Sequence, residues 1–380
     1  MPGKHGDDIL GAEGGELIFD AGASAAAAES SGVGGNACRM IGWSLSGFQK
    51  VGVLTNGATG RSWRMASDEG PNLNGWDAAP PPLGFLSVGF ALAFAEEIAA
   101  LARLRKVDLG TYGIEVDNFY TIEGRMRDKT MRGGALPVVV SIVPDREIDH
   151  EAVVGLVQDA VHVASVTGAI RGSHVGRFRA VLNGAELDLQ HAKPTGALPT
   201  DPLPNCAAFP PVGATDILIP NGWSRKSESP HPLHVSAAGH VRSDLVLELT
   251  QELRAPCGSA WRFRAGGAGA PDAVSYVSAG IGFCFMTQME ILAGMHGVNL
   301  DAVRIVQDTR FGPGGASSGT GRVAAFEPVE THVFIESRTA SPAQVVELID
   351  LAERACYLHA LCRTPLKPQV RVRDRIGEAG

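Results

Sequence analysis

The sequence has few cysteines and no excess of positive charge. Six cysteines are spread over 380 residues, and no two of them form a Cys-X-X-Cys pair. In a chain of this size with no secretory signal, that distribution argues against a disulfide framework. The net charge is −8 and no basic run occurs, so we expect neither a nucleic acid nor a membrane surface as a partner.

Long apolar runs are also missing. Residues 1–35 are rich in glycine, alanine and serine and hold no apolar core of signal-peptide length, so they indicate a flexible tail. The strongest apolar stretch, from Leu83 to Ala95, is followed by two glutamates. It is shorter than the roughly 20 residues that a bilayer span requires. We therefore expect a buried core helix and a cytoplasmic protein.

The sequence does contain one long segment twice. Residues 84–120 align with residues 275–311 without a gap, at an offset of 191 positions. Several pairs are identical, among them Gly89 with Gly280, Leu101 with Leu292, and Asp117 with Asp308. Each copy predicts a long apolar helix, a short turn and a strand.

A second repeated pair follows at an offset of 192: "VVVSIVPDREIDHEAVVGLVQDAVHVASVTGAI" and "HVFIESRTASPAQVVELIDLAERACYLHALC". Each segment predicts a β-branched strand followed by an amphipathic helix. Upstream, Trp63 and Trp261 match in "GRSWRM" and "GSAWRF". We therefore predict an α+β fold of two tandem domains, residues 36–185 and 236–375, joined by a Pro/Gly-rich connector at residues 186–235.

The two copies differ in their cysteines. Cys284 on the long helix of the second copy is matched by Ala93, and Cys356 on its later helix is matched by Ala164. Loss of both thiols together is expected if the two act as a pair. A reactive cysteine must be a thiolate, and in an apolar setting its pKa is lowered only by a nearby cation. The candidate cations on the strands just upstream are Arg242, Arg254 and Arg262.

Two stretches resemble a known family. "GFCFMTQME", around Cys284, resembles the cysteine helix of the OsmC/Ohr family (osmotically inducible protein C and organic hydroperoxide resistance protein), and "LAERACYLHAL" resembles its second cysteine helix. The resemblance covers residues 236–375 and, without cysteines, residues 36–185. It implies a monomeric pseudodimer that fuses two subunits of an intertwined homodimer, each a β-meander packed on long central helices. One of the two active sites would keep its cysteines.

The resemblance also implies an activity: a thiol peroxidase, or a related thiol redox enzyme, acting on a small organic hydroperoxide. Cys284 would be the nucleophilic thiol and Cys356 the resolving thiol, and a dithiol reductant would reset the disulfide. No cofactor is implied. The other candidate catalytic residues are Arg262, Arg242 and Asp272. The candidate substrate-binding residues are Trp63, Trp261, Tyr276, Phe283 and Gln288.

Two positions depart from the family pattern. Val274 stands ten residues before Cys284, where the family has a glutamate, and Cys356 is followed by tyrosine instead of proline. A cysteine-dependent hydrolase or desulfhydrase acting on a small thio-compound or heterocycle therefore stays open, and so does a non-enzymatic binder with an apolar groove. Polar side chains for a hydrolytic pocket are available nearby: Thr287, Gln288, His296 and His359.

Two further patterns resemble binding motifs but do not predict a site. His231 and His234 have a spacing that suits zinc, but no third ligand is near them in the sequence, so we expect no metal site. "GPGGASSGTG", residues 312–321, lacks the lysine and the following helix of a phosphate-binding loop. A hairpin connection between two strands is predicted there.

Overall fold

The computed structural model describes residues 17–22, 37–146, 149–202, 217–224, 229–242 and 244–373. The chain is α+β, as the sequence predicts. Most of the expected N-terminal tail, and Cys206 in the connector, lie outside the described residues. The described part of the tail differs from expectation, because Ile18 and Phe19 are buried in a short strand.

The elements fall into two series along the chain. The first series is β1 (Ile18–Asp20), β2 (Ala37–Ser44), β3 (Lys50–Asn56), β4 (Arg61–Ser67), η1 (Pro71–Leu73), α2 (Pro82–Arg105), β5 (Tyr112–Glu123), β6 (Arg132–Ala135), β7 (Val139–Pro144), α3 (His150–Val163), η2 (Ser165–Thr167), α4 (Gly168–Arg171), β8 (Arg177–Leu182) and β9 (Ala185–Leu187). The second series is β10 (Leu218–Trp223), β11 (Leu233–Val241), β12 (Leu247–Ala255), β13 (Cys257–Ala265), α5 (Ala273–Met295), β14 (Ala302–Arg310), β15 (Glu330–Glu336), α6 (Pro342–Ala355), α7 (Tyr357–Arg363) and β16 (Gln369–Val372).

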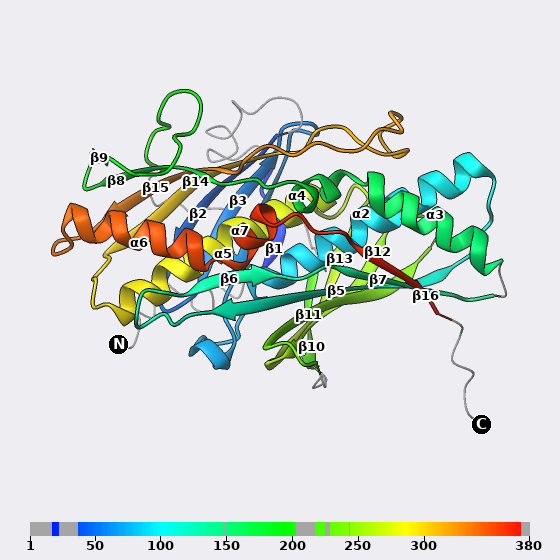
Figure 1. Cartoon of the computed structure of the whole chain (residues 1–380), viewed down its shortest axis with the longest axis horizontal. Coiled ribbons are helices and arrows are strands. Elements are labelled where there is room, and N and C mark those ends of the chain that lie inside the picture. Colours follow the sequence, from blue (N-terminus) through cyan, green and yellow to red (C-terminus); the bar gives the residue numbers. More distant parts are fainter. Residues whose placement is uncertain are drawn as a thin grey trace.

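Two sheets lie on either side of the long helices α2 and α5 (Figure 1). One sheet has the strand order β1-β4-β3-β2-β14-β15-β8-β9. The other has the order β10-β13-β12-β11-β5-β7-β16, with β6 paired to β5. The two orders match position by position: β1, β4, β3 and β2 of one sheet correspond to β10, β13, β12 and β11 of the other, and β14 and β15 correspond to β5 and β7. The shorter helices α3 and α6 lie toward opposite ends of the molecule (Figure 1).

Each sheet takes strands from both series. The meander β2-β3-β4 continues into β14 of the second series, with Arg39 opposite Asp308. In the same way the meander β11-β12-β13 continues into β5 of the first series, with Ser236 opposite Asp117. Backbone hydrogen bonds therefore cross between residues 36–185 and residues 236–375 in both sheets, so neither segment completes a sheet by itself.

Two glycines at matching positions let α2 and α5 approach each other closely. A Cβ atom on Gly89 would lie 2.7 Å from the carbonyl oxygen of Ala273, and one on Gly280 would lie 2.9 Å from that of Pro82. Real side chains do not tolerate such contacts with backbone, so both positions require glycine. The repeat in the sequence thus reflects a repeated helix contact.

By length and composition alone, α2 and α5 are apolar enough to cross a membrane. In both helices 83% of the apolar window is buried inside the protein, where the helices pack on each other and between the sheets. Internal packing accounts for their apolar sequence. The stretch from Leu83 to Ala95 lies within α2 and is buried, as expected.

Candidate active site

The two cysteines that the first copy lacks meet in the interior. The Sγ atoms of Cys284 and Cys356 are 3.2 Å apart, and neither cysteine is in a disulfide. Cys284 is 3% exposed and Cys356 is fully buried. A disulfide requires sulfur atoms about 2.05 Å apart, so a small movement of either side chain brings the pair to bonding distance.

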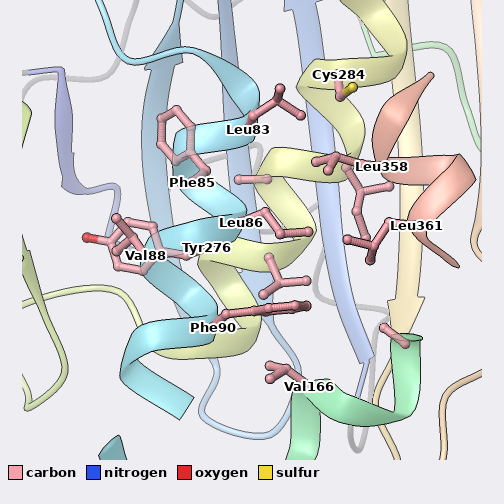
Figure 2. Close-up of a cluster of buried hydrophobic side chains, with 14 of the residues drawn as sticks. Leu83, Phe85, Leu86, Val88, Phe90, Val166, Tyr276, Cys284, Leu358 and Leu361 are labelled. Atoms are coloured by element: carbon pink, nitrogen blue, oxygen red, sulfur yellow. The ribbon is translucent and has the colours of Figure 1, made fainter. Parts of the chain in front are cut away.

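The end of α6 places Cys356 beside Cys284. Cys356 has an extended backbone (φ −66°, ψ 120°) that stops α6, and α7 begins at the next residue. Leu358 and Leu361 of α7 point toward α5, which carries Cys284 (Figure 2). Ala164, the counterpart of Cys356, ends α3 with a similar backbone (φ −53°, ψ 145°), so the first copy keeps the geometry of this corner without the thiol.

Strand β6 covers the corner from outside. A Cβ atom on Gly133 would lie 2.5 Å from the carbonyl oxygen of Ala355, directly before Cys356. Glycine is needed here because the backbone of β6 rests on the end of α6. This contact explains why Cys356 is fully buried although it lies at a helix end.

A histidine contacts the second thiol. His359 Nδ1 lies 3.2 Å from the Sγ atom of Cys356, and the residue is 1% exposed. The rings of Phe178 and Phe285 lie 5.6 and 5.7 Å from the imidazole ring and hold it in an apolar setting. His359 Nε2 makes no hydrogen bond within the described part of the chain. The sequence placed His359 near Cys356 but gave no sign that the two touch.

The environment separates the two thiols electrostatically. Burial, and then the neighbouring Cys356, raise the pKa of Cys284 well above its ordinary value. Burial opposes ionisation of Cys356 as well, but its contacts with the Cys284 thiol and with His359 outweigh burial, so its pKa lies well below the ordinary value. The first proton therefore leaves Cys356, and the Cys284 thiol donates a hydrogen bond to the resulting thiolate.

A polar cluster begins one helical turn beyond Cys284, where two residues of the first half, Glu69 and Lys50, meet α5. The Thr287 hydroxyl donates a 2.7 Å hydrogen bond to Glu69, whose pKa is raised to about 7, chiefly by burial. The buried Lys50 amine lies 3.4 Å from the Glu290 carboxylate. Sequence analysis missed Glu69 and Lys50 because both precede Cys284 by more than 200 positions, and only the fold brings them close.

The structure does not bring the two candidate arginines to the thiols. Along β13 side chains alternate, so Trp261 and Phe263 face the core while Arg262 is exposed. Arg242 is exposed directly after β11. Within the described residues neither arginine hydrogen-bonds Cys284 or Cys356; the side-chain hydrogen bonds of these two cysteines are with each other and with His359. Arg254, also considered, pairs instead with Glu115 at 2.7 Å.

The remaining candidate residues support the helices. Asp272 caps α5 by accepting a hydrogen bond from the Ser275 backbone and another from Asn56. It lies twelve residues before Cys284, about 18 Å along a helix. Tyr276 donates a hydrogen bond to the carbonyl oxygen of Arg264. The other candidates are buried core side chains: Trp63, Trp261, Phe283 and Gln288.

Comparison with known proteins identifies the part of the chain that holds this site. The model of the family "OsmC-like protein" matches residues 266–371, which run from the residues just before α5 to β16. No curated protein and no solved structure gave a significant match. The segment that carries Cys284, Cys356 and His359 is therefore similar to the OsmC-like family.

Proposed function

We propose that the protein is a two-cysteine thiol peroxidase that reduces small organic hydroperoxides. The observation that carries this proposal is the 3.2 Å separation of the Cys284 and Cys356 sulfur atoms. A pair at this distance passes directly from a sulfenic acid to a disulfide. The match of residues 266–371 to the OsmC-like family supports redox chemistry at these thiols.

The contacts favour Cys356 for the first step, the reverse of the order that the resemblance implies. The Cys356 thiolate attacks the terminal oxygen of the hydroperoxide, the O–O bond breaks, and the alcohol leaves with a proton from the site. The Cys284 sulfur then attacks the sulfur of the Cys356 sulfenic acid. A disulfide forms, and hydroxide leaves with the Cys284 proton as water.

A dithiol reductant completes the cycle. Its two thiols are oxidised to a disulfide while the Cys284–Cys356 disulfide is reduced by two exchange steps. The apolar side chains around the thiols, among them Phe178 and Phe285, favour a small apolar substrate. No cofactor takes part in this scheme.

We further propose that the chain is a fused pseudodimer whose first half supports the active half. The strand exchange between β2 and β14, and between β11 and β5, supports this proposal. So does the glycine contact that recurs in both halves of the α2–α5 packing. The first half also supplies Glu69, Lys50 and β6 to the surroundings of the thiols, so it can lose its own cysteines and still be needed.

Single serine variants test the peroxidase. With dithiothreitol as the reductant, Cys356→Ser should abolish the consumption of cumene hydroperoxide. Without dithiothreitol, which would itself reduce a sulfenic acid, Cys284→Ser should consume about one equivalent of hydroperoxide and accumulate a sulfenic acid that dimedone traps. Cys257→Ser, at a half-exposed thiol on β13, is the matched control and should behave like the unmodified protein. Full turnover by Cys356→Ser would refute the proposed thiolate.

A hydrolytic activity is the second candidate, because Cys356 and His359 form a cysteine–histidine contact. In that reaction the Cys356 thiolate attacks an electrophilic carbon, and His359 donates a proton to the leaving group. Cys284 would not be needed. Sulfide or ammonia release that persists in Cys284→Ser but is lost in Cys356→Ser and in His359→Gln would select this activity over the peroxidase.

A further inference from the structure

A cavity of about 520 Å³ is lined by residues of both halves of the chain. Its wall includes Glu96 of α2, Ser165 at the start of η2, Phe311 after β14, and Val274 of α5. This volume falls in the range of ordinary small-molecule sites. No candidate function discussed above uses this cavity.

The cavity lies where the first copy would have had its thiols. Glu96 is one turn after Ala93, which aligns with Cys284, and Ser165 directly follows Ala164, which aligns with Cys356. In the second copy the position of Ser165 is held by Tyr357. The Tyr357 ring lies 5.5 Å from that of Tyr120, and Tyr120 is the counterpart of Phe311.

Loss of one large side chain contributes to the open space. A serine at position 165 leaves unfilled the volume that a tyrosine occupies in the second copy. Cys284 and Cys356 are buried, whereas the corresponding corner of the first half borders the cavity. The same helix corner encloses the thiols in the second half and borders the cavity in the first half. The position of the cavity therefore follows from the fold.

The wall formed by the glycine-rich segment is fixed by an acidic residue. The Glu97 carboxylate accepts hydrogen bonds from the backbone N–H groups of Ala316 and Ser317 and from the Ser317 hydroxyl. Gly315 has φ +84°, and a Cβ atom there would lie 2.2 Å from the Glu97 carboxylate. The two N–H groups are thereby used inside the protein, so they do not offer an anion site.

Glu96 is the polar group that the cavity presents without a partner. Within the described part of the chain it makes no ion pair and no hydrogen bond, although it is half-buried. Burial, Asp272 and Glu97 raise its pKa to about 7. Arg103, two turns further along α2, also lines the cavity, but it is exposed to solvent and forms no ion pair with Glu96 within the described residues. A ligand cation would satisfy the Glu96 carboxylate, whereas the nearby carboxylates of Asp272 and Glu97 disfavour an anion at this point.

We propose that the cavity binds a small organic amine, with its ammonium group on Glu96 and its apolar part against Phe311 and Val274. The cavity offers one cation-binding carboxylate and an apolar wall, and the fixed segment of residues 312–318 makes it largely preformed. The copy that lost its thiols would thus have become a second ligand site. This proposal does not depend on the chemistry of Cys284 and Cys356.

Calorimetric titration of the full chain with benzylamine tests the proposal. Benzylamine should bind, and binding should tighten from pH 6 to pH 8 as Glu96 ionises while the amine stays protonated. Glu96→Gln should weaken binding at least about tenfold. Glu248→Gln, an exposed glutamate on β12, is the matched control and should bind like the unmodified protein. Benzoate, of the same size but negative, should not bind.

A second variant fills the cavity without changing its charge. Ser165→Tyr restores the side chain that the thiol half has at the matching position, and it should abolish benzylamine binding while the thermal unfolding temperature is kept. Benzylamine that binds Glu96→Gln or Ser165→Tyr as tightly as the unmodified protein would overturn the proposal. So would an absence of binding at millimolar benzylamine, or benzoate binding of equal strength.

Discussion

At the scale of single residues, the site depends on a difference between two neighbouring thiols. Cys284 lies in the middle of a helix among apolar side chains, where ionisation is costly. Cys356 lies at a helix end and touches His359. The same interior therefore raises the pKa of one thiol and lowers that of the other. A pair with one thiolate and one thiol is what a two-step redox cycle requires at its start.

Replacement of His359 should make Cys356 less reactive at neutral pH. His359→Gln keeps roughly the size of the side chain but removes the imidazole that contacts the Cys356 sulfur, so the pKa of Cys356 should rise and less thiolate should be present at pH 7. The rate of alkylation by iodoacetamide should fall, and its pH midpoint should shift upward. Circular dichroism checks that the fold is retained. An unchanged midpoint would show that His359 does not stabilise the thiolate.

The proximity of Cys284 and Cys356 was predictable from the sequence, but the contact of Cys356 with His359 was not. The repeat pointed to Cys284 and Cys356 because alanine stands at both matching positions. The arginine hypothesis placed the cation on the upstream strands. Period-two alternation already puts Arg262 on the face opposite Trp261 and Phe263, so this residue could have been excluded from sequence.

At the scale of elements, the α2–α5 contact is the part of the fold that the repeat predicts best. Matching glycines recur because each helix crosses the start of the other at backbone distance. The C-terminal ends of α3 and α6 also match, because each helix is stopped by a residue with extended backbone, Ala164 or Cys356. Local patterns of apolar residues, caps and glycines suffice for such features, since they depend on short stretches of chain.

Alanine at the helix crossing should destabilise the protein. A Cβ on Gly280 would meet the backbone of Pro82 and Leu86 at 2.9 and 3.1 Å, so Gly280→Ala should lower the free energy of unfolding by about 1–3 kcal/mol. Gly294→Ala, in the same helix with open space around it, is the matched control and should be neutral or stabilising by up to about 1 kcal/mol. Urea denaturation measures both. Equal effects of the two variants would contradict the close approach.

At the scale of the whole molecule, the sequence does not reveal which strands pair. The repeat is equally compatible with two separate domains and with two intertwined ones, because both contain the same elements in the same order. The intertwined arrangement follows from long-range pairings such as β2 with β14. It also brings Glu69 and β6 of the first half to the thiols of the second. Residues that come together only through such pairing leave no local pattern in the sequence.

Cutting the chain in the connector provides a test of the intertwined fold. Fragments 1–202 and 217–380 each contain only part of either sheet, so neither should fold as a monomer, since it would expose strand edges and the apolar faces of α2 or α5. Co-expressed, the two fragments should assemble one to one and keep the hydroperoxide consumption proposed for the intact chain, because all strand pairings are restored without a covalent link. Sedimentation velocity and activity assays measure both properties. A fragment 217–380 that is a folded monomer, with a cooperative unfolding transition and full activity, would show that the second half does not need strands from the first.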